Sequence, residues 1–129
     1  MPGIADAFTS IAKTYNQVII SSGLSASIAG YLCQHSLDHT VSHVLGADVA
    51  PSKADKVRMV FRDFHTGPCD CVFVTDTLGD VREVAALGVQ VIAVTWGFHG
   101  RERLLLGQPY AIIDHPDELP ETISTFFRR

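Results

Sequence analysis

Residues 71–94 read CVFVTDTLGDVREVAALGVQVIAV. They contain two apolar runs, separated by a short segment that mixes polar and apolar residues. The runs at 71–75 and 89–94 are continuous, which is typical of strands that are covered on both faces. Between them, Thr77 and Asp80 have the spacing of a helix-capping pair. A strand, a helix and a strand in this order predict two parallel strands joined by a crossover helix.

The same alternation continues outward in both directions. Apolar spacing predicts helices over 4–15, 24–32, 52–64, 80–87 and 101–106 and from Pro116 onward, and strands over 18–20, 41–45 and 110–113. No linker or repeat interrupts the pattern, so residues 1–129 are predicted to form a single domain. We expect an α/β fold of three layers, with a mostly parallel sheet between two layers of helices.

Composition excludes several classes of protein. The formal net charge of −4 gives no basic surface for nucleic acid. No apolar run approaches the roughly 20 residues that cross a membrane, and residues 1–6 lack the basic start of a secretion signal. The three cysteines are too few and too poorly spaced for a disulfide framework, so we expect them to be reduced. The expected compartment is the cytoplasm.

Polar residues follow the predicted strands where parallel sheets bind their ligands, beyond the carboxyl ends. They are Ser21, Ser22, Gly23, Lys53, Asp76 and Asp80. The Ser-Ser-Gly turn opens a helix, where unpaired N–H groups favour an anion. Turn or capping chemistry explains each residue singly, but it does not explain a hydroxyl turn, a lysine and an aspartate pair at successive strand ends.

This order resembles the motifs of the haloacid dehalogenase superfamily, in particular its phosphoglycolate-phosphatase-like members. Residues 18–23 look like the second motif, with Ser21 as the phosphate-binding hydroxyl. Lys53 looks like the third-motif lysine, which balances charge between nucleophile and phosphate, and Lys56 is the weaker candidate for that role. The resemblance covers nearly the whole chain.

Residues 74–80 look like the fourth motif, which binds magnesium. The resemblance implies that Asp76 reaches Mg²⁺ and that Asp80 supports it. Thr75 stands where the family usually has glycine. The implied activity is that of a phosphatase acting on a small phosphorylated molecule, within a core that has no cap domain.

The family's first motif, an Asp-x-Asp pair after an apolar strand, has no counterpart in this sequence. That pair supplies the nucleophile, and loss of a nucleophile costs on the order of 10⁶ in turnover in other enzymes. The chain alone is therefore expected to be inactive, as a truncated or split member of the family. One alternative is a non-catalytic module that binds phosphate or a protein. Another is a phospho-acceptor receiver with Asp76 as acceptor, disfavoured because its first strand ends in serines.

In the family, the first-motif strand lies between the strands that correspond here to residues 18–21 and 71–75. Without it, these two strands either pair directly, giving the flavodoxin-like order 2-1-3-4-5, or receive a strand from another chain. We expect direct pairing, because unpaired backbone groups on buried strands are costly. Association into a homo-oligomer is the secondary expectation.

Overall fold

The computed structural model describes residues 2–128 as an alternation of helices and short strands. The α-helices are α1 (Ile4–Ala12), α2 (Ser25–Gln34), α3 (Lys53–Phe64), α4 (Leu78–Ala85), α5 (Arg101–Leu105) and α6 (Leu119–Arg128). The strands are β1 (Val18–Ile20), β2 (His43–Leu45), β3 (Val72–Thr75), β4 (Gln90–Val94) and β5 (Ala111–Ile113). Short 3₁₀ turns are η1 (Asp38–Thr40), η2 (Pro68–Asp70) and η3 (Pro116–Glu118).

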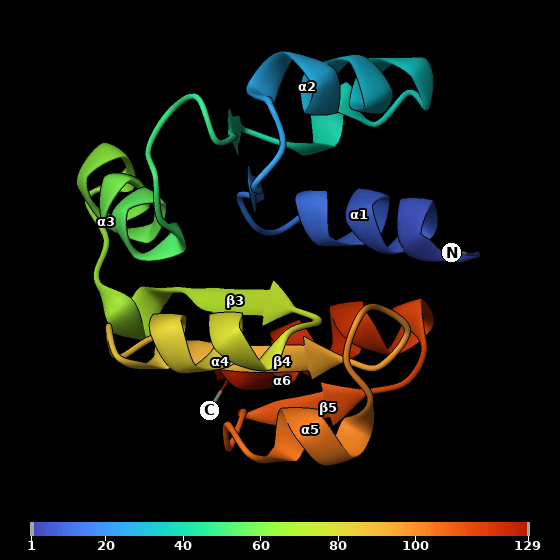
Figure 1. Ribbon diagram of the computed structural model, residues 1–129. Coiled ribbons are helices and arrows are strands. Elements are labelled where there is room, and N and C mark those ends of the chain that lie inside the picture. The colour runs from blue at the N-terminus through green and yellow to red at the C-terminus, as the bar shows by residue number, and fades with distance from the viewer. Residues whose placement is uncertain (1, 129) are drawn as a thin grey trace.

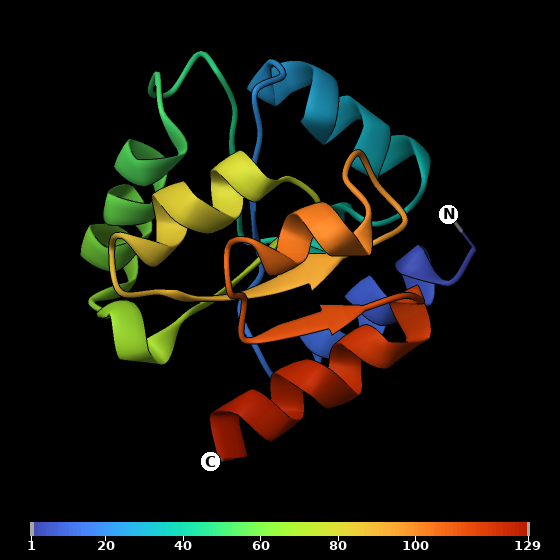
Figure 2. The same cartoon turned by 60° about the horizontal axis from the view of Figure 1, so that its bottom comes forward.

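The strands β3, β4 and β5 form a parallel sheet in that order, with Phe73 opposite Val91 and Ala93 opposite Ile112. Helices cover both faces of this sheet, and Figure 2 shows α4 and α5 on one face and α6 on the other. On the first face, Val81 and Leu104 pack against β4, and on the second, Ile11 and Ile123 pack against β4 and β5. The expected three-layer α/β architecture is confirmed.

The strands β1 and β2 form a separate two-stranded parallel sheet, with Ile19 opposite Val44. Figure 1 shows these strands between α1 and α3, apart from the arrows of β3 and β4. Within residues 2–128, β1 pairs only with β2, and β3 pairs only with β4. The expected direct pairing of β1 with β3, and with it the closed order 2-1-3-4-5, is therefore wrong.

Flanking helices account for the separation of the two sheets. α3 packs against both β1 and α4, and α1 packs against α6 and η3. Because these helices are fixed to the larger sheet, they hold β1 at a distance from β3. As a result the strand residues beside the gap, expected to be buried, are only partly covered, and Val74 is 37% exposed.

Capping follows the sequence. The Ser52 hydroxyl accepts a hydrogen bond from Asp55 N and caps the start of α3, and the Thr77 hydroxyl accepts one from Asp80 N and caps the start of α4.

All three cysteines are free, as predicted. Among residues 2–128, no helix combines the length and apolar character that crossing a bilayer would require.

Candidate functional site

Ser21 follows β1 and uses all three of its polar groups. Its N–H donates to Leu45 O at 3.0 Å, and its Oγ accepts from Gly23 N at 3.0 Å. Its carbonyl oxygen accepts from Lys56 Nζ at 2.8 Å. The turn is therefore held rigidly, while the hydroxyl that accepts from Gly23 still has its own proton to donate.

The amino terminus of α2, expected to offer N–H groups to an anion, is partly occupied by the chain itself. Ser25 N donates to Asp48 Oδ1 at 2.7 Å, and this hydrogen bond is the main cause that lowers the pKa of Asp48. Gly46 lies against Gly23 O and Ser25 N so closely that a side chain there would overlap them. An anion at this turn would meet the Ser21 hydroxyl and the first amides of the turn rather than the N–H of Ser25.

Lys53 and Asp80 form an ion pair at the start of α3 and α4. Lys53 Nζ lies 3.1 Å from Asp80 Oδ2, and the two side chains are 22% and 17% exposed. The same oxygen accepts a hydrogen bond from Thr75 Oγ1 at 2.8 Å. Thr75, which departs from the resembled motif, therefore supports Asp80 from the end of β3.

Asp76 is held by the loop after β4. Its Oδ2 accepts from Phe98 N at 2.7 Å, and its backbone oxygen accepts from His99 N at 3.0 Å. A Cβ at Gly97 would overlap the Asp76 carboxylate, so this position requires glycine. The His99 ring accepts from Leu78 N at 2.9 Å through Nδ1, which ties the loop to the start of α4.

The predicted site residues thus fall into two groups. Lys53, Asp80 and Asp76 lie around the ends of β3 and the start of α4, whereas Ser21, Ser22 and Gly23 lie at the end of β1. Helix α3 connects the groups, because Lys53 contacts Asp80 and Lys56 contacts Ser21.

Sequence reasoning missed three contacts that build this edge. Glu83 Oε2 accepts a hydrogen bond from Ala54 N at 2.9 Å, and His99 Nδ1 accepts one from Leu78 N. Lys56 donates to Ser21 O and takes no part in the ion pair of Lys53 and Asp80. Each contact joins residues far apart in the sequence, so no local sequence pattern predicts it.

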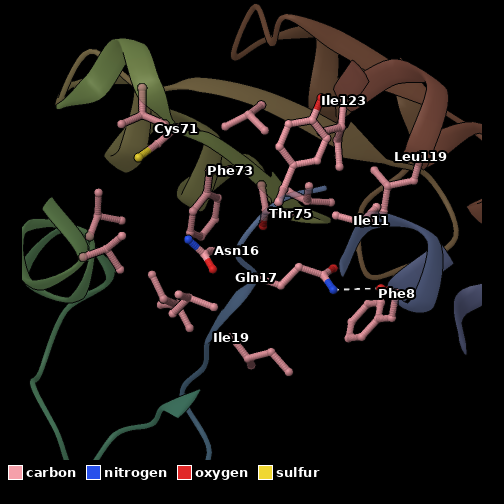
Figure 3. A pocket seen from close by; sticks show the side chains of 18 of the residues that line it. Phe8, Ile11, Asn16, Gln17, Ile19, Cys71, Phe73, Thr75, Leu119 and Ile123 are labelled. Carbon is pink, nitrogen blue, oxygen red and sulfur yellow. Dashed lines mark hydrogen bonds between the residues drawn. The ribbon is translucent and has the colours of Figure 1, made fainter. Parts of the chain in front are cut away.

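The gap between β1 and β3 is a cavity of about 830 Å³, here called the slot. Figure 3 shows side chains from both strands and from α1 and α6 around it, including Ile19, Phe73, Phe8 and Ile123. Helix α3 adds Val60, Phe61 and Phe64 to its wall. Thr75, Asp76 and Gly97 also line the slot, so the slot reaches the carboxyl edge of the sheet.

Within residues 2–128, no cluster of three or more His, Cys, Asp or Glu side chains is arranged to hold a metal ion. Asp76 lines the slot and has one carboxylate oxygen engaged by Phe98 N, and the Asp80 carboxylate is paired with Lys53. Mg²⁺ is commonly held by one or two carboxylates together with substrate phosphate. Asp76 fits the role of one such ligand, whereas the Asp80 carboxylate at the same edge is already paired with Lys53.

No family model matches the sequence. A curated phosphoglycolate phosphatase from Synechococcus elongatus is 25% identical over 129 residues, covering 99% of this chain and 61% of that protein. The chain therefore spans less than two thirds of the length of this relative.

Solved structures share the same fold. A haloacid dehalogenase-like hydrolase from Streptococcus pneumoniae matches with a TM-score of 0.86 and 24% identity, over 98% of this chain and 59% of that one. A predicted phosphatase from Clostridium acetobutylicum matches with a TM-score of 0.87 and 23% identity, over 96% of this chain and 59% of that one. The resemblance found in the motifs is confirmed for the fold: the chain has the haloacid dehalogenase-like fold.

Proposed function

We propose that residues 1–129 are one core domain of a haloacid dehalogenase-like phosphatase, which binds phosphate at the carboxyl edge of its strands. The observation that carries this proposal is the slot, which ends at Asp76 and separates two strands whose facing edges have no strand partner within residues 2–128. The 25% identity to a phosphoglycolate phosphatase supports the reaction class. The reaction of the whole protein is hydrolysis of a small phosphomonoester, and its compartment is the cytoplasm.

Each residue at the edge has a proposed role. The Ser21 hydroxyl and the amides of Ser22 and Gly23 bind phosphate oxygens, since hydroxyl and N–H donors suit an anion. Lys53 balances the charge of the bound phosphate, held in place by Asp80. Asp76 is the ligand that this chain contributes to Mg²⁺, which when bound neutralises the charge of the phosphoryl group.

The slot is proposed to receive a strand from outside residues 1–129 that carries the missing carboxylates. Both walls of the slot are apolar, with α3 on one side and α1 and α6 on the other, so such a strand must be apolar on both faces. Its carboxyl end would lie beside Asp76, because neighbouring parallel strands end at the same edge. That is where an attacking carboxylate and a second metal ligand are required.

The first prediction is that the purified 129-residue chain has negligible phosphatase activity with Mg²⁺ and p-nitrophenyl phosphate. The attacking carboxylate is absent from the sequence, and removal of a nucleophile costs on the order of 10⁶ in turnover. The measurement compares the chain with Asp76→Asn and with a mock purification. Turnover that survives in the wild type and disappears in Asp76→Asn would contradict this prediction and make a residue of this chain the nucleophile.

The same chain is then assayed with a peptide of about five apolar residues followed by Asp-x-Asp, a length typical of short strands. Turnover that requires both the peptide and Asp76 supports the phosphatase. Phosphate binding without turnover, with the peptide bound, favours the non-catalytic phosphate-binding module instead.

A further inference from the structure

Lys56 is a charged side chain in a buried place. It is 2% exposed and is the one charged residue among the buried polar side chains of residues 2–128. Lysine is seldom buried unless it is paired, because taking an ammonium group out of water is costly. What Lys56 contacts therefore needs an explanation beyond packing.

Its contact is with a carbonyl oxygen instead of a carboxylate. Lys56 Nζ lies 2.8 Å from Ser21 O, and none of the ion pairs within residues 2–128 includes Lys56. Lys53, three residues earlier on α3, is instead paired with Asp80. The positive charge at Lys53 is thus offset by contact, and the charge at Lys56 is not.

This charge lies behind the turn that is proposed to bind phosphate. Ser21 is the residue whose Oγ accepts from Gly23 N, and its carbonyl is the acceptor for Lys56. Asp48, which caps α2 through Ser25 N, is the acidic side chain influenced by Lys56, and it is fully exposed and engaged by that cap. A phosphate bound at Ser21 would therefore be attracted by the positive charge of Lys56.

We propose that Lys56 is a positioning residue of the phosphate site, which fixes the Ser21–Gly23 turn and supplies the positive charge that favours an anion there. This inference rests on the proposed function and assigns the second lysine of α3 a role separate from that of Lys53. Lys53 pairs with Asp80, next to the proposed metal ligand, and Lys56 supports the turn that carries the Ser21 hydroxyl.

The experiment titrates the ¹⁵N-labelled 129-residue chain with inorganic phosphate at constant ionic strength and follows the amides of Ser22 and Gly23 by NMR. Lys56→Met keeps the apolar stem without the charge, and Lys56→Gln keeps an N–H donor without the charge. Lys13→Met removes an exposed lysine as the matched control. Amide exchange of Ser22 and Gly23 is measured in each variant without phosphate.

We expect Lys56→Met and Lys56→Gln to weaken phosphate binding by about tenfold or more, the loss expected for one charge-assisted contact, and Lys13→Met to change it less than about twofold. Exchange at Ser22 and Gly23 should be faster in Lys56→Met than in Lys56→Gln, since glutamine can still donate to Ser21 O. If Lys56→Met does not fold, the phosphate affinity of Lys56→Gln decides whether Lys56 has the proposed role.

Two results overturn different claims. Folded Lys56 variants that bind phosphate as the wild type does, while Ser21→Ala weakens binding, overturn the role of Lys56 and leave the phosphate site standing. A wild-type chain whose Ser22 and Gly23 amides do not respond to phosphate overturns the site in the proposed function, and the role of Lys56 with it.

Discussion

Gly97 shows how closely one residue is fitted to the carboxylate beside it. A Cβ at this position would overlap Asp76, whereas a Cβ at Gly30, on the exposed face of α2, would meet nothing within 4 Å. We therefore predict that Gly97→Ala lowers the free energy of unfolding by about 1–3 kcal/mol, as overpacked substitutions do. Gly30→Ala, the control, should raise it by about 0.5–1 kcal/mol because alanine favours a helix. Urea denaturation of both variants measures the two values, and equal effects would show that the loop around Asp76 is free to move.

The ion pair of Lys53 and Asp80 is predicted to be worth more than an exposed pair. Its side chains are 22% and 17% exposed, whereas those of Arg62 and Asp63 are 70% and 32% exposed. A double-mutant cycle with Lys53→Met and Asp80→Asn should give a coupling free energy of about 1 kcal/mol, near the upper end for accessible pairs. The cycle for Arg62 and Asp63 should give about 0–0.5 kcal/mol. Coupling at Lys53 that is no larger than at Arg62 would leave Asp80 supported mainly by Thr75.

Prediction from sequence succeeded at residues whose partners are close in the chain. Ser52 and Thr77 cap their helices within three residues, so the sequence alone identifies them. The burial of Lys56 and the Glu83 cap of α3 depend on segments 35 and 29 residues away, which no local pattern reveals. Asp76 and Asp80 were predicted as candidates, but their partners, the loop after β4 and Lys53, emerge only once the chain is folded.

At the scale of elements, the strands were predicted with small errors in their ends, and the parallel pairing of β1 with β2 and of β3, β4 and β5 was predicted as well, whereas the pairing of β1 with β3 was wrong. The run at 18–20 became β1 with the same bounds, and the run at 71–75 became β3 from Val72. Apolar composition indicates that a strand has neighbours, but it does not identify them. Direct pairing of β1 and β3 was expected from the cost of unpaired backbone groups, and the packing of α1 and α3 against the larger sheet prevents it.

The open edges of β1 and β3 give a prediction for these elements. A peptide with an apolar strand followed by Asp-x-Asp should raise the melting temperature of the chain and slow amide exchange in β1 and β3, because it satisfies their backbone groups. Exchange in β4, which already has partners on both sides, should change less. The control peptide differs by one proline in the middle of the strand, and proline cannot complete the hydrogen bonds. Equal stabilisation by the two peptides would mean that the slot binds apolar side chains without the peptide pairing as a strand with β1 and β3.

At the scale of the whole molecule, the two sheets are united by helices instead of by backbone pairing. α3 packs on β1 and on α4, and α1 packs on α6, so each bridges the slot from one side. Polar contacts tie α3 to each side of the slot, through Lys53 to Asp80 on α4 and through Lys56 to Ser21 after β1. The molecule thus keeps its three-layer order while one position in the sheet stays open.

The two lysines lie three residues apart on α3, which places their Cα atoms about 4.5 Å apart along the helix axis. Lys53 reaches Asp80 on α4, which covers the larger sheet, and Lys56 reaches Ser21 at the end of β1, so α3 is anchored to both halves of the molecule. Whatever enters the slot must therefore fit a width that the packing of α1 and α3 has already set.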